Sequence, residues 1–569
     1  MKNKDVIWEI VYKPDSKKGK ELKNKDIIAI LLDNRGLTTA TQRKDFFKSV
    51  HPKKITINSL GISAKEISQA LRRIQKAIKD KEEILVYGDY DADGICATAI
   101  LWECLYSYTK KVLPYIPDRF SEGYGLNGES VNKLKTKYPK LKLIITVDNG
   151  IVANEAVVKA SDLGIDVIVT DHHQKGKKLP KAHSIIHTDK ISGSGIAWIL
   201  AREILSKLPA ASFQLQNSLQ LAGIGTIADQ LPLVEVNRSF AKYGLEELNR
   251  TKRVGLLALF AEAGLDTFKD TVLHGRGIGT YEVNFVIAPR INAMGRLEHA
   301  IDSLRLLCTK SYEKARELAK YIGKTNRERQ RVVDEVVFHA RDIAQKSIWK
   351  GAIVLAHESY HEGVIGLAAA KLVEEFYRPA IVFARGEKIS KASARSISGF
   401  NIIESIRKLD SIILGGGGHP MAAGFSIETK KIKIFQEKFE KIAEKLLTDD
   451  LLTKKLKIDC ELSFALIDES LVAKLKEFDP SGIGNPTPTF ATRRVRLVDA
   501  RTVGQEGKHL KIVIEKDGHI FQAIGFGWGN FFSNILQEGF YDIAFTVEEN
   551  IWNGSTNIQL KIKDIKVSN

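Results

Sequence analysis

Residues 84–94 read Ile-Leu-Val-Tyr-Gly-Asp-Tyr-Asp-Ala-Asp-Gly, an apolar run that leads directly into three alternating aspartates. Apolar runs of this length, rich in Val and Ile and bounded by Gly and Asp, are typical of buried strands in a parallel sheet. In open parallel sheets, ligands bind at the carboxyl ends of the strands. This stretch therefore predicts an α/β fold with acidic side chains at one edge of its sheet.

Three further apolar runs end in the same way: 143–147 before Asp148, 167–170 before Asp171-His172-His173, and 224–228 before Asp229. We interpret all four runs as buried parallel strands. Their carboxylates and imidazoles would then converge on one sheet edge, where their mutual repulsion is tolerable only if cations lie between them. The pattern predicts a two-metal phosphoesterase.

A calcium loop or a plain turn accounts less well for the aspartates. The pattern Asp89-x-Asp91-x-Asp93-Gly94 also resembles the start of a calcium-binding EF-hand loop, but that loop needs a glutamate at its twelfth position, where this chain has Ile100. It also needs a preceding helix, whereas the preceding run is strand-like. A structural turn would account for one aspartate beside a glycine, but not for three at alternate positions. The metal-site interpretation is therefore favoured.

The residue types indicate which metal to expect. A single histidine after a strand is most often an ordinary hydrogen-bonded residue, but His172 and His173 are adjacent and follow Asp171. Imidazole together with carboxylate suits Mn²⁺, Fe or Zn²⁺, whereas oxygen-only sites suit Mg²⁺ or Ca²⁺. No thiolate belongs to these motifs. We therefore expect two Mn²⁺ ions, with Mg²⁺ as the substitute.

Composition narrows the class of protein. The chain has 569 residues, and 86 Lys and Arg against 69 Asp and Glu give a net charge of +17. This excess favours polyanionic partners, although a lysine-rich solvated surface would account for it equally well. The four cysteines form no C-x-x-C pair, which argues against a zinc knuckle and favours a reduced, cytoplasmic location. The sequence shows no signal peptide and no apolar run of membrane length, so no membrane association is expected.

The periodicity of apolar residues divides the chain into five parts. Strands alternate with helical stretches to about residue 235, a charged segment without proline over 311–346 predicts a long helix, and short alternating strands follow residue 454. The predicted domains are an N-terminal appendage (1–60), a parallel-sheet catalytic domain (61–310), a connecting helix (311–349), a second α/β subdomain (350–450) and an OB-like β-barrel (451–569). Within the catalytic domain, Ala288–Arg296 is predicted to be a loop.

Two segments of the second α/β subdomain are predicted to be anion-cradling loops. Ser393–Ser396 contains Arg395, whose guanidinium can bind a phosphate through two hydrogen bonds. The glycines of Gly415–His419 would let backbone N–H groups approach an anion. The glycine run alone could equally be a flexible turn.

The predicted connecting helix carries a cluster of four basic residues, Lys324, Arg327, Arg329 and Arg331. The cluster could be a solvated helix face or could line a nucleic-acid path, and the sequence favours neither. No Walker A pattern is present, which disfavours an NTP-driven motor.

The motifs resemble those of a known family, the DHH phosphoesterase superfamily. Its four ordered motifs are matched by Gly88–Gly94, Val147–Gly150, Thr170–His173 and Gly225–Asp229, and the glycine-His signature of its associated subdomain by Gly415–Gly424. Five further segments are similar to the superfamily's single-strand-specific exonucleases: Pro117–Phe120, Gly123–Leu126, Ala288–Ala293, His361–Gly366 and Pro480–Pro486. The resemblance extends from about residue 50 to 569. Gly94-Ile95-Cys96 and His187-Thr188-Asp189 depart from the usual pattern, but neither departure removes a candidate ligand.

The resemblance implies roles for the residues of these motifs. Two Mn²⁺ ions would be held by Asp91, Asp93, Asp148, His172 and Asp229, with Asp148 as the bridging ligand. Asp89 would orient the cluster or join it as a ligand, and His173 would be a ligand or contact the scissile phosphate. The 5′-terminal phosphate would be bound by Arg119, Arg290, Ser393 and Arg395, and the nucleotide by His419.

The function implied by the resemblance is 5′→3′ hydrolysis of single-stranded DNA, with release of 5′-mononucleotides, in DNA recombination and repair. Two metal ions sharing Asp148 would activate a water for in-line attack, and the barrel would hold the strand by stacking and charge. The partners would be single-stranded DNA with a 5′ end and, as a further candidate, a helicase or a single-strand-binding protein.

Two alternatives stay open. One is a phosphodiesterase for nanoRNA or cyclic dinucleotides within the same superfamily, against which the C-terminal barrel and the basic charge argue. The other is a non-catalytic scaffold that joins replication complexes. Such degenerate relatives typically lose the acidic ligands, whereas all of them are present here.

Overall fold

The computed structural model describes residues 6–13, 23–208, 212–265, 277–346, 351–535, 539–552 and 555–568. The chain forms two compact units, which are described separately. The first gathers residues up to Glu9, Arg296–Glu298 and Lys324–Leu456. The second gathers Ile10–Gly295, His299–Gly323 and Lys457–Asn569, and it contains both the predicted catalytic sheet and the C-terminal barrel.

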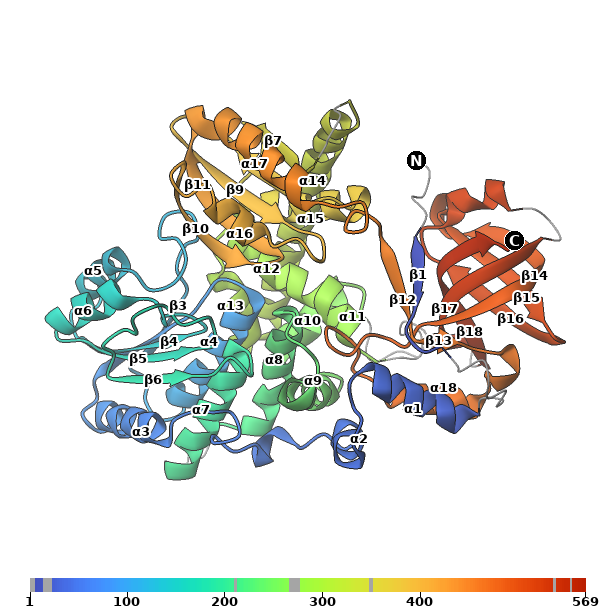
Figure 1. The fold of residues 1–569 in the computed structure, drawn as a ribbon. Helices are drawn as coiled ribbons and strands as arrows, with labels where there is room; N and C mark the ends of the chain where they lie inside the picture. Colours follow the sequence, from blue (N-terminus) through green and yellow to red (C-terminus); the bar gives the residue numbers. More distant parts are fainter. Residues whose placement is uncertain are drawn as a thin grey trace. The chain divides into compact units, whose positions relative to one another are not determined.

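The second unit contains the predicted parallel sheet. Its strand order is β3 (Val112–Tyr115), β2 (Glu83–Tyr87), β4 (Leu141–Val147), β5 (Asp166–Asp171) and β6 (Ser184–His187), and every neighbouring pair is parallel. Helices cover both faces, as Figure 1 shows. One face packs against α3 (Ala64–Lys79), α4 (Ala92–Tyr106) and α7 (Gly193–Lys207), and the other against α5 (Gly128–Lys137) and α6 (Asn154–Asp162). Burial on both faces explains the continuous apolar runs.

One of the four predicted strands is wrong. Residues 224–228 form the last turn of helix α8 (Leu215–Ala228), and Asp229 caps its C-terminus. The helix is buried over Ser218–Ile227, so its sequence is apolar all round. A short apolar run cannot be assigned to a strand or a buried helix by periodicity alone. Asp229 therefore approaches the site from a helix end, not from the sheet.

Several helices complete this part of the second unit: α9 (Glu235–Leu248), α10 (Val254–Glu262), α11 (Thr280–Glu282), α12 (Ala288–Leu297) and α13 (Ile301–Cys308). The predicted loop Ala288–Arg296 is wrong, because these residues belong to α12, which follows the π-helical turn Val283–Ile287. The three elements α11, the π-helical turn and α12 are continuous, so Pro289 lies within a helical segment that begins at Thr280. It directly follows the π-helical turn, the part of the segment where the regular hydrogen-bond pattern is already interrupted.

The predicted connecting helix is confirmed as α14 (Tyr312–Lys346). It leads into the first unit, whose sheet has the order β10 (Ile413–His419), β11 (Ala422–Glu428), β9 (Ile389–Arg395), β8 (Ala380–Ala384) and β7 (Ile353–His357). Helix α15 (Ile365–Phe376) packs on one face with α14, and α16 (Ile402–Arg407) and α17 (Ile432–Leu446) pack on the other.

Both predicted anion-cradling loops are strands in this sheet. Ser393–Arg395 belongs to β9 and Gly415–His419 to β10, and each strand pairs with β11. Because glycine weakens strand propensity, a run of four glycines gives no strand signal in the sequence. Some backbone N–H groups of these segments are therefore used in hydrogen bonds between strands, and the side chains of the segments lie on the faces of a sheet.

The predicted OB-like barrel is confirmed in the second unit. Strands β14 (Phe490–Val503), β15 (His509–Lys516), β16 (His519–Gly525), β18 (Ser555–Val567) and β17 (Phe540–Trp552) form a ring that closes through β14 and β17. Helix α18 (Glu469–Lys476) precedes the ring, and α1 (Asn24–Asn34) packs beside it (Figure 1). Residues of α1 and α2 (Ala40–Phe47) enter the barrel's hydrophobic core, while β1 (Ile7–Ile10) pairs with β12 (Lys455–Ile458).

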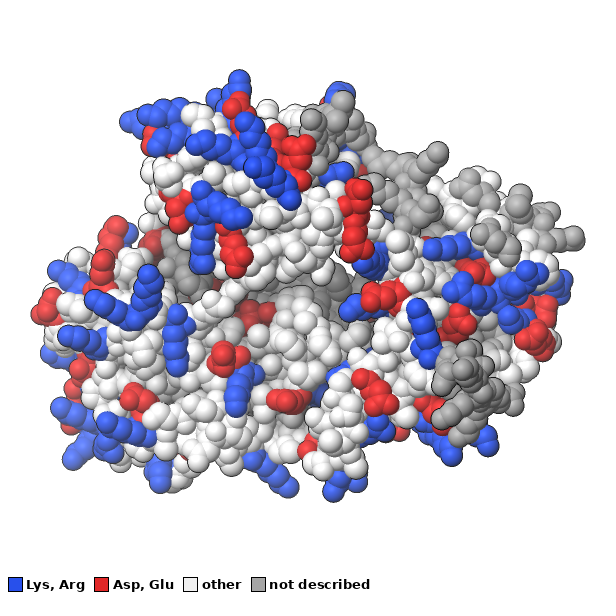
Figure 2. All heavy atoms as spheres, viewed as in Figure 1, with Lys and Arg blue, Asp and Glu red and all other residues white. Residues whose placement is uncertain are grey.

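The charge is spread over the surface. Figure 2 shows Lys and Arg side chains over much of the visible face, with acidic residues among them, so charge on that face does not single out one path for nucleic acid. Among the described residues, no helix is long and apolar enough to cross a membrane.

Candidate metal centre

The carboxyl ends of three neighbouring strands supply most of the predicted ligands. Asp89, Asp91 and Asp93 follow β2, Asp148 follows β4, and His172 follows β5. The chain turns sharply after β2, because Asp91 is the N-cap of α4 and accepts a hydrogen bond from Gly94 N–H at 3.0 Å. The alternating aspartates thus occupy a single strand-to-helix turn. This placement agrees with the rule for open parallel sheets.

The structure brings all seven candidate metal-site residues together. Their ligand atoms form three overlapping groups, each with all atoms within 4.8 Å of one another: Asp89, Asp91 and Asp148; Asp93, His172 and Asp229; and Asp148, His172 and His173. His172 Nε2 lies 3.1 Å from Asp148 Oδ1 and 3.6 Å from Asp229 Oδ2. Asp148 and His172 each belong to two groups, which suits a site with two neighbouring ions.

The chemistry of the cluster fits divalent cations. Asp89 Oδ1, Asp148 Oδ1 and His172 Nε2 are buried and have no hydrogen-bond partner outside the cluster, which is costly for polar atoms unless something binds them. Burial and the neighbouring acids raise the pKa of Asp89 and of Asp148 well above the ordinary range, and they raise the pKa of Asp229 to about 8. Oxygen and nitrogen donors without thiolate suit Mn²⁺ and Mg²⁺. The residues present therefore fit the expected ions.

Helix α7 contributes a support that the sequence did not reveal. The Asp93 carboxylate accepts hydrogen bonds from Gly193 N–H (2.7 Å) and Ser194 N–H (3.1 Å), both in the first turn of α7. Exposed N–H groups and the helix dipole favour an anion there. A Cβ at Gly193 would lie 2.4 Å from Asp148 Oδ1, and one at Gly225 would lie 2.1 Å from Asp93 Oδ1. Only glycine fits at these two positions.

Asp171 holds the histidine pair in place. Its carboxylate accepts hydrogen bonds from Ile151 N–H (2.8 Å) and His172 N–H (2.7 Å), and His173 Nδ1 lies 2.8 Å from its Oδ1. Burial alone would disfavour a charged imidazole, but the hydrogen bond and charge of Asp171 raise the pKa of His173 to about 9. Burial lowers the pKa of His172. At neutral pH, these shifts favour a neutral imidazole at His172, the form that can bind a metal, and a cationic imidazole at His173.

Two candidate phosphate-binding arginines lie in this unit with different partners. The Arg119 guanidinium lies 5.1 Å from the centroid of the Tyr90 ring, within the aspartate-rich turn. Arg290 is engaged by the protein itself: its Nε lies 3.1 Å from Glu262 Oε2, and its Nη1 donates to Val286 O at 3.0 Å. The placement of Arg119 fits a role near the cluster better than that of Arg290 does.

Asn292 on α12 reaches the aspartate-rich turn directly. Its Oδ1 accepts a hydrogen bond from Ala92 N–H at 2.7 Å, between the candidate ligands Asp91 and Asp93. A Cβ at Gly295 would lie 2.7 Å from Tyr90 O, so α12 packs closely against the same turn. Because α12 was predicted to be a loop, this contact was not expected from the sequence.

We expect Asn292→Ala to weaken Mn²⁺ binding by about tenfold, because residues that hold ligands in place typically contribute that much to metal affinity. Isothermal titration with Mn²⁺ would measure the change. Asn154→Ala removes an amide that donates only to nearby backbone carbonyls and is the matched control. Equal affinities in both variants would contradict the role of Asn292.

The remaining substrate-binding candidates share one face of the first unit's sheet. Ser393, Gly424 and Gly417 pair in one row across β9, β11 and β10, and Arg395, Ala422 and His419 pair in a second row. Residues directly opposite one another in an antiparallel sheet lie on the same face. The rows combine a hydroxyl, a guanidinium and an imidazole with small residues.

The first turn of α15 lies beside this surface. A Cβ at Gly366 would lie 2.8 Å from Ser393 Oγ and 3.1 Å from Arg395 Nη2. Arg395 donates to Ser393 Oγ (3.2 Å) and Ala394 O (2.9 Å), and no ion pair to a carboxylate is found for it among the described residues. Burial lowers its pKa. A largely buried guanidinium without an acidic partner is well suited to a phosphate.

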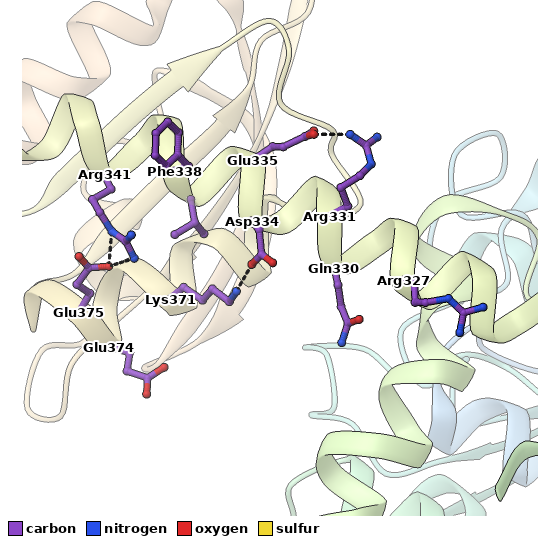
Figure 3. A pocket seen from close by; sticks show the side chains of 11 residues that line it. Arg327, Gln330, Arg331, Asp334, Glu335, Phe338, Arg341, Lys371, Glu374 and Glu375 are labelled. Atoms are coloured by element: carbon purple, nitrogen blue, oxygen red, sulfur yellow. Dashed lines mark hydrogen bonds and ion pairs between the residues drawn. The ribbon is translucent and has the colours of Figure 1, made fainter. Parts of the chain in front are cut away.

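The basic cluster on α14 is mostly engaged by neighbours. Arg331 forms ion pairs with Glu328 and Glu335, and Arg329 donates to Asn326. Figure 3 shows Arg331 and Arg327 beside a pocket of about 1060 Å³ between α14 and α15, where further ion pairs join Lys371 to Asp334 and Arg341 to Glu375. Such internal pairing favours the solvated-face interpretation of this cluster.

Comparison with known proteins identifies the class. The DHH family N-terminal domain matches residues 83–226, the DHHA1 domain matches 350–445, and the RecJ OB domain matches 458–564. Together with the acid–histidine cluster, these matches define a metal-dependent hydrolase of the DHH class.

The chain belongs to the RecJ family. It is 36% identical to the single-stranded-DNA-specific exonuclease RecJ of Bacillus subtilis over 99% of this chain and 71% of the relative. It is 31% identical to the RecJ of Escherichia coli, over 87% and 86% of the two chains. The crystal structure of Thermus thermophilus RecJ with Mn²⁺ superposes with a TM-score of 0.82 at 27% identity, covering all of this chain and 80% of that one. A second structure of that protein holds Mg²⁺, so both expected ions occur in the family.

Proposed function

We propose that this protein is a metal-dependent exonuclease specific for single-stranded DNA, working 5′→3′ in recombination and repair. The observation that carries the proposal is the buried cluster of acids and histidines, in which Asp148 Oδ1 and His172 Nε2 have no hydrogen-bond partner outside the cluster. Similarity to exonucleases along the whole chain, barrel included, favours this function over a dinucleotide phosphodiesterase. The complete set of acidic ligands favours it over a non-catalytic scaffold.

In this proposal the cluster holds two divalent ions. One would lie among Asp89, Asp91 and Asp148, and the other among Asp93, His172 and Asp229. The ions would lower the pKa of a bound water and offset charge on the phosphate. The N-terminus of α7 fixes the Asp93 carboxylate, and Asp171 holds His173, whose cation would contact a phosphate oxygen.

We assign recognition of the strand end to the surface on the first unit. Arg395 and Ser393 would bind the 5′-terminal phosphate, with the α15 N-terminal turn beside them. His419 is exposed at the end of β10, where it can contact the terminal nucleotide. Arg119 would bind phosphate near the metal centre. Arg290 has the least structural support, because Glu262 already pairs with it. An end held in this way would make digestion proceed from the 5′ terminus.

The barrel offers a surface for the rest of the strand. Arg501, Lys511 and Lys561 lie in one row across β14, β15 and β18, with Ile524 of β16 between the two lysines. Phe526 is 49% exposed, and Lys561 Nζ lies 5.0 Å from its ring centroid. In such an arrangement the cations can bind the phosphate backbone of a single strand, and the exposed aromatic ring can stack on its bases.

We expect the double variant Lys511→Ala, Lys561→Ala to bind single-stranded DNA more weakly. The slope of log affinity against log salt should fall by about 1.4, because each lost phosphate contact contributes about 0.7 for single strands. Fluorescence anisotropy at several salt concentrations measures both quantities. Lys516→Ala is the control on the same strand, since Lys516 Nζ donates to Arg493 O. An unchanged salt slope would count against this surface.

The activity itself is tested with end-labelled single strands of DNA and RNA, digested with Mn²⁺ and resolved over time. We expect stepwise shortening of DNA from the 5′ end. Cleavage of dinucleotides alone would support the phosphodiesterase alternative, and no cleavage of any substrate would contradict the proposal.

The remaining parts of the proposal concern organisation and context. We place the domain limits at 60/61, 310/311, 349/350 and 450/451, which enclose the three family matches. A helicase or a single-strand-binding protein is the proposed partner, since either would deliver single strands. A cytoplasmic location is supported by the four cysteines, all of which are free thiols.

A further inference from the structure

The segment after Asp229 is held in an unusual conformation. Residues 230–234 connect α8 to α9, and Gln230 (φ 60°) and Glu235 (φ 45°) lie at the two ends of this connector. Both are non-glycine residues in the left-handed region, which side chains rarely adopt unless the surroundings impose it. The packing around this connector therefore affects the position of Asp229, which directly precedes it.

Asp229 differs from Asp93 and Asp171 in how its carboxylate is held. The carboxylates of Asp93 and Asp171 are each held by backbone N–H groups. No such donor to the Asp229 carboxylate is found among the described residues, and its side chain is 27% exposed, against 2% for Asp148. The backbone on either side of Asp229 therefore contributes to its position, besides the neighbouring side chain of His172.

The loop that leads into the barrel packs against this connector. We call residues 477–486 the barrel-approach loop. Leu233 N–H donates to Ile483 O at 2.7 Å. A Cβ at Gly482 would lie 2.7 Å from Leu233 Cδ1, and one at Gly484 would lie 3.1 Å from Pro232 Cβ. Two glycines thus let the loop approach the connector closely.

Arg238 joins the loop to the helix that follows the connector. Its side chain is 1% exposed, and its guanidinium donates at 2.8–3.3 Å to the carbonyl oxygens of Phe46, Glu477, Phe478, Asp479 and Pro480. Four of these carbonyls belong to residues 477–480, which directly follow α18 and whose carbonyls are therefore not used by helical hydrogen bonds. Its guanidinium carbon also lies 4.1 Å from the centroid of the Phe46 ring. Arg238 therefore fixes the start of α9 to the barrel-approach loop.

We propose that the barrel-approach loop positions the metal centre, and that Arg238 and Gly482 are positioning residues that act through Asp229. The inference rests on the proposed role of Asp229 as a metal ligand. In this proposal the C-terminal domain has a second function besides DNA binding. Its first loop packs against the backbone that follows Asp229 and so stabilises the position of that proposed ligand. The ion affected would be the one among Asp93, His172 and Asp229, and not the one among Asp89, Asp91 and Asp148.

Two variants of the full chain test this proposal. Gly482→Ala places a methyl group against Leu233, and Arg238→Lys keeps the charge while removing most of the donors. Gly128→Ala is the control, because a Cβ there meets open space. Binding of Mn²⁺ is followed by electron paramagnetic resonance and titration calorimetry, with thermal unfolding and metal-free DNA binding measured in parallel.

We expect the wild type and Gly128→Ala to bind two Mn²⁺ ions. In Gly482→Ala and Arg238→Lys, one ion should bind about tenfold more weakly and the other within about twofold of wild type. The kcat at low Mn²⁺ should fall and recover when Mn²⁺ is raised, with KM for DNA unchanged.

The outcomes separate this inference from the proposed function. A wild type that binds fewer than two ions would contradict the function itself. Two ions in the wild type, with unaltered affinities in both variants, would overturn the positioning role alone. Equal weakening of both ions would also overturn it, since that pattern indicates a general loss of structure.

Discussion

Asp148→Asn should reduce hydrolysis of single-stranded DNA by at least about a thousandfold, the scale of loss that follows removal of a residue essential to a catalytic unit. Asp148 contributes to two of the three ligand groups, so its charge is shared more widely than that of any other acid in them. Asparagine keeps the shape of the side chain. It also tolerates the left-handed backbone at this position, where φ is 64°. The substitution therefore removes charge without straining the fold.

Digestion of an end-labelled strand at saturating Mn²⁺ measures this loss. Binding of single-stranded DNA should remain within a few-fold of wild type, because the proposed strand contacts lie on the barrel and on the first unit. Asp189→Asn, at an exposed position after β6, is the control and should keep full activity. Retained Mn²⁺-dependent turnover in Asp148→Asn would refute the central place of this residue.

Arg395→Ala should remove the preference for strands with a 5′-phosphate. A charge-assisted hydrogen bond to a phosphate contributes about 1.5–3 kcal/mol, which corresponds to roughly 10- to 150-fold in binding. Arg395 has no ion pair to a carboxylate among the described residues, so this contribution is available to a ligand. The measured quantity is the ratio of kcat/KM for phosphorylated and hydroxyl-ended strands of the same sequence.

Arg378→Ala is the matched control for that experiment. Burial lowers the pKa of Arg378 as it does that of Arg395, but Arg378 donates to Gly351 O and lies outside the two rows of β9, β11 and β10. The Arg378→Ala variant should prefer strands with a 5′-phosphate to the same extent as the wild type. A phosphate preference that survives in Arg395→Ala would place the end-binding site elsewhere.

The sequence predicts the sheet and the candidate ligands at its edge because both leave local signals. The runs before Asp89, Asp148 and Asp171 are buried on two faces and end in residues that parallel strands rarely carry inside. The run before Asp229 gives the same local signal from a buried helix, so the residue was placed in the cluster while its element was misassigned. Residue type predicted the clustering of these side chains better than it predicted the secondary structure.

The supports of the cluster could not be predicted in the same way. Asn292 lies 200 positions after its partner Ala92, and Gly193 lies 100 positions after Asp93. Contacts of this kind depend on how distant helices pack, which no local pattern encodes. The glycine-rich strand β10 was not predicted for another reason. Its pairing with β11 comes from the register of the sheet and not from strand propensity.

Binding of Mn²⁺ to the metal-free protein tests the two-metal centre most directly. Titration calorimetry in buffers of different ionisation enthalpy gives the number of ions and the protons released. We predict two Mn²⁺ ions per chain. We also predict release of at least one proton at pH 7, because the pKa of Asp229 is raised to about 8 and that carboxyl must lose its proton to bind metal. The proton of Asp229 alone should make affinity rise about tenfold per pH unit up to about pH 8. Absence of Mn²⁺ binding, or equal binding in wild type and Asp148→Asn, would contradict the two-metal centre.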